Sequence, residues 1–231
     1  MMYHYYNLYK MKKIGFIAVF CSLVVVVSAQ QPMQTRKFHD EESANILKEL
    51  QKKISAYKDI SIQFTFRSEK KEKFIDEIKG TTLIKGDKYV LKTDQQQIYC
   101  NAITVWNYLP EQKEVTVSQY DKEDDSQMMN PLKMIQGYEK SYKSNFIRET
   151  VEKGVLIQEI DLTPLKSSSY YKIRLTLDKN KKQITRVVVY EKDGTQYTYI
   201  VNKFEVNKNL SDGAFVFDSS KYSGVEVIDI R

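Results

Sequence analysis

The sequence is poor in the residues that support metal binding and nucleophilic catalysis. Its 231 residues include two His and two Cys. A zinc site needs three or four convergent ligands, and a nucleophile needs a base within hydrogen-bonding reach. The chain also has no Gly-rich phosphate-binding loop and no Gly-x-Ser-x-Gly turn. Most enzyme classes are therefore disfavoured, and we expect no catalytic residues, no metal site and no cofactor.

Glycine and proline are also scarce. Eight Gly and four Pro exclude collagen-like and low-complexity chains. Hydrophobic residues make up 42% and charged residues 29%, which excludes a disordered chain and a membrane protein with many spans. The length fits one domain or two small ones.

The first 29 residues have the features of a secretory signal peptide. Three lysines precede an apolar run at 14–27. A membrane span needs about 20 apolar residues, and this run is shorter. Val27 and Ala29 occupy the small-residue positions before a cleavage site. We therefore expect 1–29 to be removed and 30–231 to be exported to the periplasm as one domain.

Removal of the leader changes the charge and the cysteine count. The remaining 202 residues carry 33 basic and 30 acidic side chains, a net charge of +3 in place of +6. Basic and acidic residues are interspersed, so we expect no nucleic-acid partner. Cys100 then has no second cysteine for an internal disulfide, and we expect it to be a small buried hydrophobe. His39 is expected in a solvated loop.

Hydrophobic spacing predicts a helix followed by strands. Asp40 is the expected N-cap, and the helix ends near Lys58. Its apolar stripe consists of Ala44, Leu47, Leu50, Ile54 and Tyr57. The period then changes to two, and Ile60, Ile62, Phe64 and Phe66 alternate with polar residues.

Similar strands recur along the chain. They are predicted at 74–85, 88–93, 97–101, 103–109, 114–120, 146–152, 155–163, 170–178, 183–191, 195–206 and 225–230. A short amphipathic helix is predicted at 131–142, with Pro at its first position. About eleven strands with one apolar face form a sheet too wide to leave uncovered. It either closes around a core or curls into an open barrel whose mouth the helices fill, and two amphipathic helices favour the open barrel.

Apolar and aromatic strand residues are candidates for lining a hydrophobic cavity, since such pockets are built from these side chains. The alternative for each residue is ordinary core packing. The candidates are Ile62, Phe64, Phe66, Leu83, Tyr89, Leu91, Trp106, Tyr108, Ile160, Leu162, Ile173 and Leu175.

The order of several stretches resembles the LolA family of periplasmic carriers of outer-membrane lipoproteins. After the first helix come 60–66, 80–91, 103–115, 130–132, and finally 215–217 with 224–227. The resemblance covers nearly all of 30–231 and rests on this order, not on a catalytic signature.

The resemblance implies an eleven-stranded, incomplete antiparallel β-barrel with helices forming a lid over an apolar cavity. It implies a monomeric carrier with acylated lipoproteins as cargo, an inner-membrane release complex that hydrolyses any ATP, and possibly an outer-membrane acceptor. Lid residues that fill the empty cavity and move aside for lipid would be Leu132, Met134, Ile135 and Tyr138. One departure concerns the lid: Gly86 and Asp87 stand where the better-known branch has Arg-Pro, whose Arg helps to hold it.

Two other functions remain open at this point. The same half-barrel could bind another lipid, or a partner protein in envelope-stress signalling. A hydrolase of envelope lipids is the third hypothesis, and the sequence shows no nucleophile–base set for it.

Overall fold

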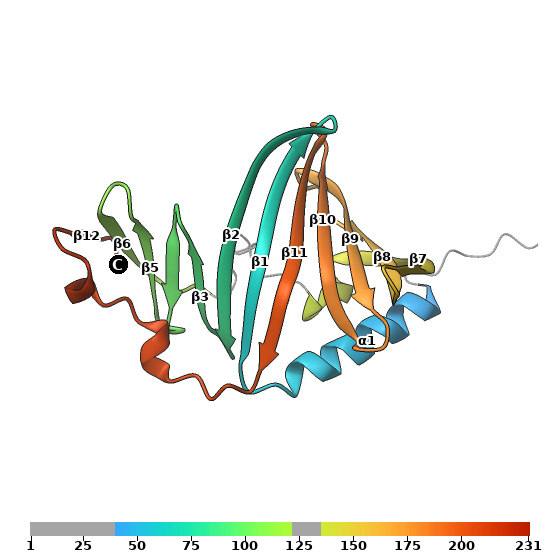
Figure 1. The fold of residues 1–231 in the computed structure, drawn as a ribbon, viewed down its shortest axis with the longest axis horizontal. Coiled ribbons are helices and arrows are strands. Elements are labelled where there is room, and N and C mark those ends of the chain that lie inside the picture. The colour runs from blue at the N-terminus through green and yellow to red at the C-terminus, as the bar shows by residue number, and fades with distance from the viewer. Residues whose placement is uncertain (1–39, 122–134) are drawn as a thin grey trace, which may run out of the picture. The chain divides into compact units, whose positions relative to one another are not determined.

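The computed structural model describes residues 40–121 and 135–231 (Figure 1). In these ranges the chain forms one α-helix and one twelve-stranded sheet. No helix in the described ranges combines the length and apolar character needed to cross a membrane. The leader, His39, Leu132 and Met134 lie outside the described residues.

Helix α1 (Glu41–Ser55) begins where the sequence predicts. Asp40 caps it, and its Oδ1 accepts a hydrogen bond of 2.7 Å from the Ser43 amide. Glu41 and Glu42 place negative charge at the positive end of the helix dipole. The helix ends a few residues before the predicted boundary. Its buried face carries Leu47, Leu50 and Ile54 of the predicted apolar stripe.

The strands form two antiparallel meanders. The first contains β1 (Ile60–Lys70), β2 (Lys73–Lys85), β3 (Lys88–Thr93), β4 (Gln97–Cys100), β5 (Thr104–Leu109) and β6 (Glu114–Gln119). The second contains β7 (Tyr142–Glu152), β8 (Val155–Pro164), β9 (Tyr170–Asp178), β10 (Gln183–Glu191) and β11 (Thr195–Val206). Pairing of β1 with β11 joins them into the order β12-β6-β5-β4-β3-β2-β1-β11-β10-β9-β8-β7.

The sheet formed by the described residues is open, because its two end strands, β12 and β7, do not pair with each other. It has twelve strands, one more than the eleven that the family resemblance implied. The final strand, β12 (Glu226–Asp229), lies parallel to β6, while the expectation was an antiparallel arrangement throughout. The chain runs from the end of β11 along the sheet to this edge, where β12 is found (Figure 1).

The predicted helix at 131–142 does not extend to its expected end. Gly137 has φ of +76°, a left-handed conformation that ends helices. A single 3-10 turn follows at Tyr138–Lys140, and β7 begins at Tyr142. The earlier residues 131–134 lie outside the described part of the chain.

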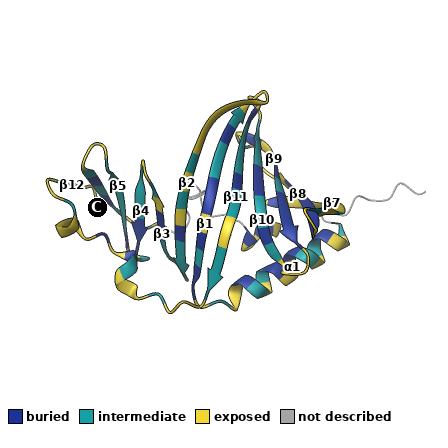
Figure 2. Ribbon diagram, in the orientation of Figure 1, coloured by how far each residue is buried: buried dark blue, intermediate teal, exposed yellow. Residues whose placement is uncertain are grey.

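The two faces of the sheet carry separate apolar clusters. Buried residues lie along β1, β8, β9 and β10 (Figure 2). We call the face that packs against α1 the inner face and the opposite one the outer face. Leu91 belongs to the inner apolar cluster, and its neighbour Val90 belongs to the outer one. Consecutive strand residues point to opposite faces, so this pair assigns the faces of β3 and, through the strand register, of its neighbours.

The C-terminal segment, residues 207–225, covers the outer face of β3–β6. Asp59 anchors its start, accepting hydrogen bonds from the amides of Lys208 (2.7 Å) and Leu210 (3.1 Å). Phe215 and Phe217 then pack in the outer cluster. That cluster also contains Val90, Tyr99, Tyr108 and Val115, with Leu83 and Trp106 packed against it. Each face of the sheet therefore has its own core.

Candidate functional site

The inner face carries a broad apolar surface. Leu47, Leu50 and Ile54 of α1 pack in one cluster with apolar residues of the sheet. In the order of the sheet, these residues extend from β3 through β2, β1, β11, β10 and β9 to β8. The buried members on the strands include Ile62, Phe64, Leu91, Ile160, Leu162, Ile173, Leu175, Leu177, Ile184, Val187 and Tyr199. Partly buried apolar side chains adjoin them: Ile46, Tyr57, Phe66, Ile84, Ile98, Phe146, Val189, Val201, Phe204 and Val206. The surface therefore includes apolar atoms that remain partly accessible.

A stacked arrangement holds the centre of this face. The rings of Phe64 and Tyr199 lie 4.4 Å apart with an angle of 23° between their planes. On the neighbouring strand, Gly80 provides the space that the Phe64 ring needs: a Cβ added at Gly80 would lie 2.5 Å from Phe64 Cζ. Burial raises the pKa of the Tyr199 hydroxyl, so it remains protonated and able to donate a hydrogen bond.

Most of the predicted cavity residues share the inner face. Seven are buried in its cluster: Ile62, Phe64, Leu91, Ile160, Leu162, Ile173 and Leu175. Phe66 packs against that cluster, and Tyr89, two residues before Leu91, shares its face.

The other three predicted residues, Leu83, Trp106 and Tyr108, lie on the outer face with Phe215 and Phe217. Grouping them with the inner-face residues was wrong. Alternation identifies residues that share a face within one strand, but it does not relate that face to the face of another strand. The aromatic residues of β5 therefore could not be assigned to the inner or the outer face of the sheet from the sequence.

Two of the four predicted lid residues are described. Ile135 and Tyr138 are 0% and 2% exposed, and both belong to the inner cluster. The side-chain amide of Gln51 on α1 donates a hydrogen bond of 2.8 Å to the carbonyl oxygen of Ile135. The described end of the β6–β7 connection is thus tied to α1 and packed against the inner face.

Several inner-face residues were absent from the prediction. Val187, Val189, Tyr199, Val201 and Phe204 come from β10 and β11 and belong to, or pack against, the inner cluster. The same alternation that identified β1 runs through these strands, so it could have identified Val187 with Val189 and Tyr199 with Val201. Gly80 could also have been noticed in the sequence, because a glycine inside a strand often marks a position that another group approaches closely.

A family comparison agrees with this architecture. Residues 55–218 match the family model described as "Outer membrane lipoprotein carrier protein LolA". The chain belongs to the LolA family. The matched range begins at the end of α1 and includes β1–β11 and the C-terminal segment as far as Asp218.

Several solved structures are similar to this chain at low identity. An uncharacterized conserved protein from Thermus thermophilus has a TM-score of 0.56 at 11% identity, and the match covers 82% of this chain and 99% of that one. A LolA superfamily protein from Nitrosomonas europaea has a TM-score of 0.42 at 12% identity, covering 76% and 98%. The lipoprotein LppX from Mycobacterium tuberculosis has a TM-score of 0.44 at 10% identity, covering 74% and 98%. No curated protein matches the chain by sequence.

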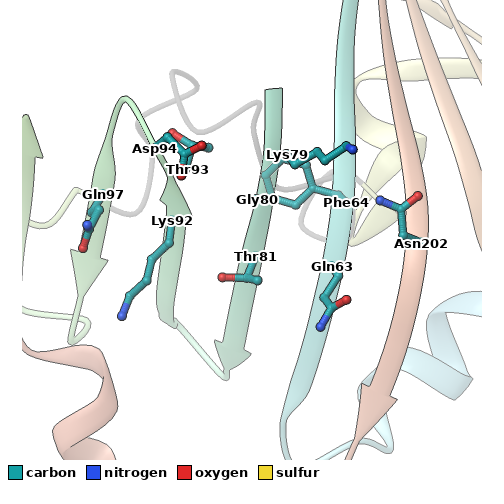
Figure 3. A pocket seen from close by; sticks show the side chains of 10 residues that line it. All are labelled: Gln63, Phe64, Lys79, Gly80, Thr81, Lys92, Thr93, Asp94, Gln97 and Asn202. Carbon is teal, nitrogen blue, oxygen red and sulfur yellow. The ribbon is translucent and has the colours of Figure 1, made fainter. Parts of the chain in front are cut away.

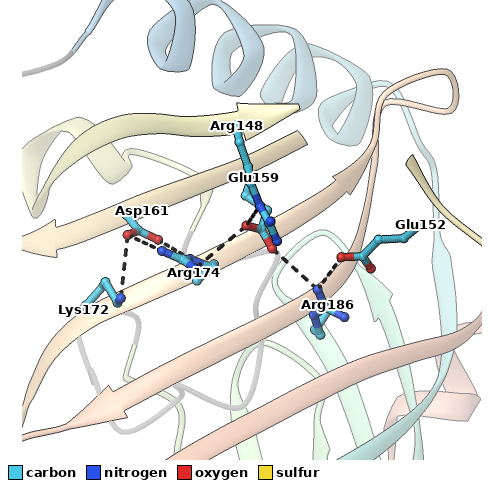
Figure 4. A network of polar contacts seen from close by, with 7 residues as sticks. All are labelled: Arg148, Glu152, Glu159, Asp161, Lys172, Arg174 and Arg186. Atoms are coloured by element: carbon cyan, nitrogen blue, oxygen red, sulfur yellow. Dashed lines mark hydrogen bonds and ion pairs between the residues drawn. The ribbon is translucent and has the colours of Figure 1, made fainter. Parts of the chain in front are cut away.

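On the outer face of this LolA-family chain, β7–β10 carry a charged network (Figure 4). The Glu159 side chain is 3% exposed, and its carboxylate lies 2.7 Å from Arg148 and 3.6 Å from Arg186. Arg174 makes two hydrogen bonds to Asp161, at 2.7 and 2.9 Å. Burying a carboxylate is costly unless it is paired, and this one is paired with several guanidinium groups. The charged outer face contrasts with the apolar inner face at the same strands.

A polar groove of about 470 Å³ lies near the first meander (Figure 3). Gln63, Thr81, Lys92 and Gln97 line it and follow one another across β1–β4 in the strand register. They alternate with inner-face residues and so belong to the outer face. Amides, hydroxyls and ammonium groups make this groove unsuitable for an acyl chain, so the inner face is the better candidate site.

Proposed function

We propose that this chain binds the acyl chains of lipoproteins on its inner face and carries them through the periplasm from the inner to the outer membrane. The observation that carries the proposal is the apolar inner face, which extends across β3, β2, β1, β11, β10, β9 and β8. Each methylene group removed from water contributes about 0.8 kcal/mol. Membership of the LolA family supports the same function.

Release of the lipoprotein requires that binding of its acyl chain also costs free energy. Ile135 and Tyr138 occupy the inner cluster in this structure. An acyl chain that takes their place must first move them and break the contact between Gln51 and Ile135. This cost offsets part of the gain from burying the chain, so that cargo is held without being trapped. Gly86 and Asp87 lie in the turn between β2 and β3, and we assign the latch to Gln51 in place of the family's Arg.

The proposal includes the route of the cargo. Residues 1–29 would direct export, an inner-membrane release complex would supply acylated lipoproteins, and an outer-membrane acceptor would receive them. Each follows from the family's role and the composition of the leader.

Adjacent residues on β11 provide the test. Val201 packs against the inner cluster, while Ile200 pairs with Arg186 on the outer face. The full chain, Val201→Asp and Ile200→Asp are expressed in a Gram-negative host, purified gently and examined by native mass spectrometry. We expect triacylated lipoproteins on the wild type and on Ile200→Asp, and their loss from Val201→Asp, because a carboxylate disfavours an apolar ligand.

Two other results would contradict the carrier function. Free lipids without lipoproteins would indicate a module that binds another lipid. A bare protein that also fails to extract lipoproteins from membranes would remove the basis for any acyl cargo.

A further inference from the structure

Two lysines that line the polar groove on the outer face have no acidic partner among the described residues. On the same face of β1 and β2, Arg67 pairs with Glu77 at 2.6 Å. Lys79 on β2 and Lys92 on β3 line the groove of about 470 Å³ and make no such ion pair with the residues that the structure describes. Asp94 also lines the groove, but it pairs with neither lysine. The groove therefore has an unbalanced positive charge.

The same two strands carry a second pair of lysines, which the chain's own C-terminal segment neutralises. Lys85 of β2 and Lys88 of β3 are opposite each other in the strand register. The carboxylate of Asp212 lies 3.0 Å from the Lys85 ammonium and 2.9 Å from that of Lys88. Lys85 also donates a hydrogen bond of 2.8 Å to the carbonyl oxygen of Leu210. A polypeptide with an acidic side chain thus lies over this end of the outer face of β2 and β3.

We propose that the groove binds an extended acidic segment of a partner protein, in the way that Asp212 binds Lys85 and Lys88. The Lys79 side chain extends toward β1, and the Lys92 side chain extends away from it (Figure 3). Because the two diverge, acidic side chains spaced along a peptide suit them better than one small anion. The groove lies on the face opposite the proposed acyl-binding surface, so this inference does not depend on the carrier function.

The uncharged groups of the groove suit a peptide backbone. The side-chain carbonyl oxygen of Gln97 accepts hydrogen bonds of 3.0 Å from the hydroxyls of Tyr99 and Tyr222. Its amide nitrogen has no acceptor among the described residues and can donate to a ligand. The amide nitrogen of Asn202 donates a hydrogen bond of 2.8 Å to Thr65, so its carbonyl oxygen can accept one. Every peptide group except that of proline has both a donor and an acceptor to match them.

The test compares two fluorescein-labelled peptides of equal length. One alternates aspartate with glycine, and the other has asparagine in place of each aspartate. Each peptide is titrated with the full chain at low salt, and binding is followed by fluorescence anisotropy. We expect the acidic peptide to bind more tightly and to lose affinity as salt is added. Lys79→Gln and Lys92→Gln should each weaken its binding by about 2- to 5-fold, the range of one exposed ion pair.

Lys179→Gln provides the matched control, because it also removes one positive charge, but outside the groove, where Lys179 pairs with Glu149 at 2.8 Å. It should leave the affinity for the acidic peptide unchanged. Lys79 and Lys92 are exposed, so their variants should keep the urea midpoint of the wild type.

Three results would overturn the inference. The first is equal affinity for the two peptides. The second is a loss in Lys179→Gln as large as the loss in Lys79→Gln or Lys92→Gln, which would indicate unspecific attraction between charges. The third is binding of inorganic diphosphate that depends on both lysines while the acidic peptide does not bind, which would assign the groove to a phosphate ligand.

Discussion

Substituting Gly80 by Ala tests the packing at the centre of the inner face. In a strand interior, alanine normally stabilises relative to glycine by about 0.5–1 kcal/mol. Here the new Cβ would lie 2.5 Å from Phe64 Cζ and 2.6 Å from the carbonyl oxygen of Lys92. Tyr199 stacks on the Phe64 ring, and the Lys92 carbonyl belongs to the backbone of β3, so neither neighbour yields easily. We therefore expect the opposite sign.

The magnitude follows from two opposing effects. Overpacking a core costs about 1–3 kcal/mol, which exceeds the gain from the lost flexibility of glycine and leaves a net loss of about 1 kcal/mol. With a urea dependence of about 2 kcal/mol per molar, the unfolding midpoint falls by roughly 0.5 M. Gly213→Ala is the control, because a Cβ there meets no described residue within 4 Å. Equal midpoints for the two variants would refute the account of the stacked centre.

Two further substitutions test how the inner face and the C-terminal segment are anchored. Asp40→Ala removes the cap of α1 and the acceptor of the Phe146 amide on β7, so thermal unfolding should show a loss of about 1–2 kcal/mol, while Asp40→Asn should lose less. Burial would raise the pKa of Asp59, but the amides of Leu210, Lys208 and Asn209 outweigh it and lower that pKa. Because the folded pKa lies below the unfolded one, the contribution of Asp59 is complete above about pH 4 and declines as pH falls further. Urea midpoints measured from about pH 5 to pH 2 should therefore fall more for the wild type than for Asp59→Asn.

Local features of the fold were predictable because their causes are local. The Asp40 cap depends on one side chain and the amide three residues later, and the alternation in β1 depends on the strand period. The same reasoning identified seven residues of the inner cluster. It failed for Leu83, Trp106 and Tyr108, because the face to which a strand turns its aromatics is decided by distant segments. Here that segment is the C-terminal one, whose Phe215 and Phe217 lie about a hundred residues away from β5 in sequence.

The order of the strands in the sheet could not be predicted from hydrophobic spacing, for the same reason. Nothing within β1 or β11 indicates that Ile60 pairs with Val206. Gly80 belongs to a stretch that resembles the family, but its role becomes visible only when Phe64 and Tyr199 are placed around it.

The pairing of β1 with β11 has a consequence for how the protein is made. Each meander consists of strands that are neighbours in sequence, so each can form from local contacts, which fold quickly. The β1–β11 pairing between them joins segments that are far apart in sequence, so it can form only after β11 has been synthesised. Phe64 on β1 and Tyr199 on β11 come into contact only when these two strands pair. An incomplete chain that lacks β11 therefore lacks the assembled inner face, and its apolar surface is completed only after most of the chain has been synthesised.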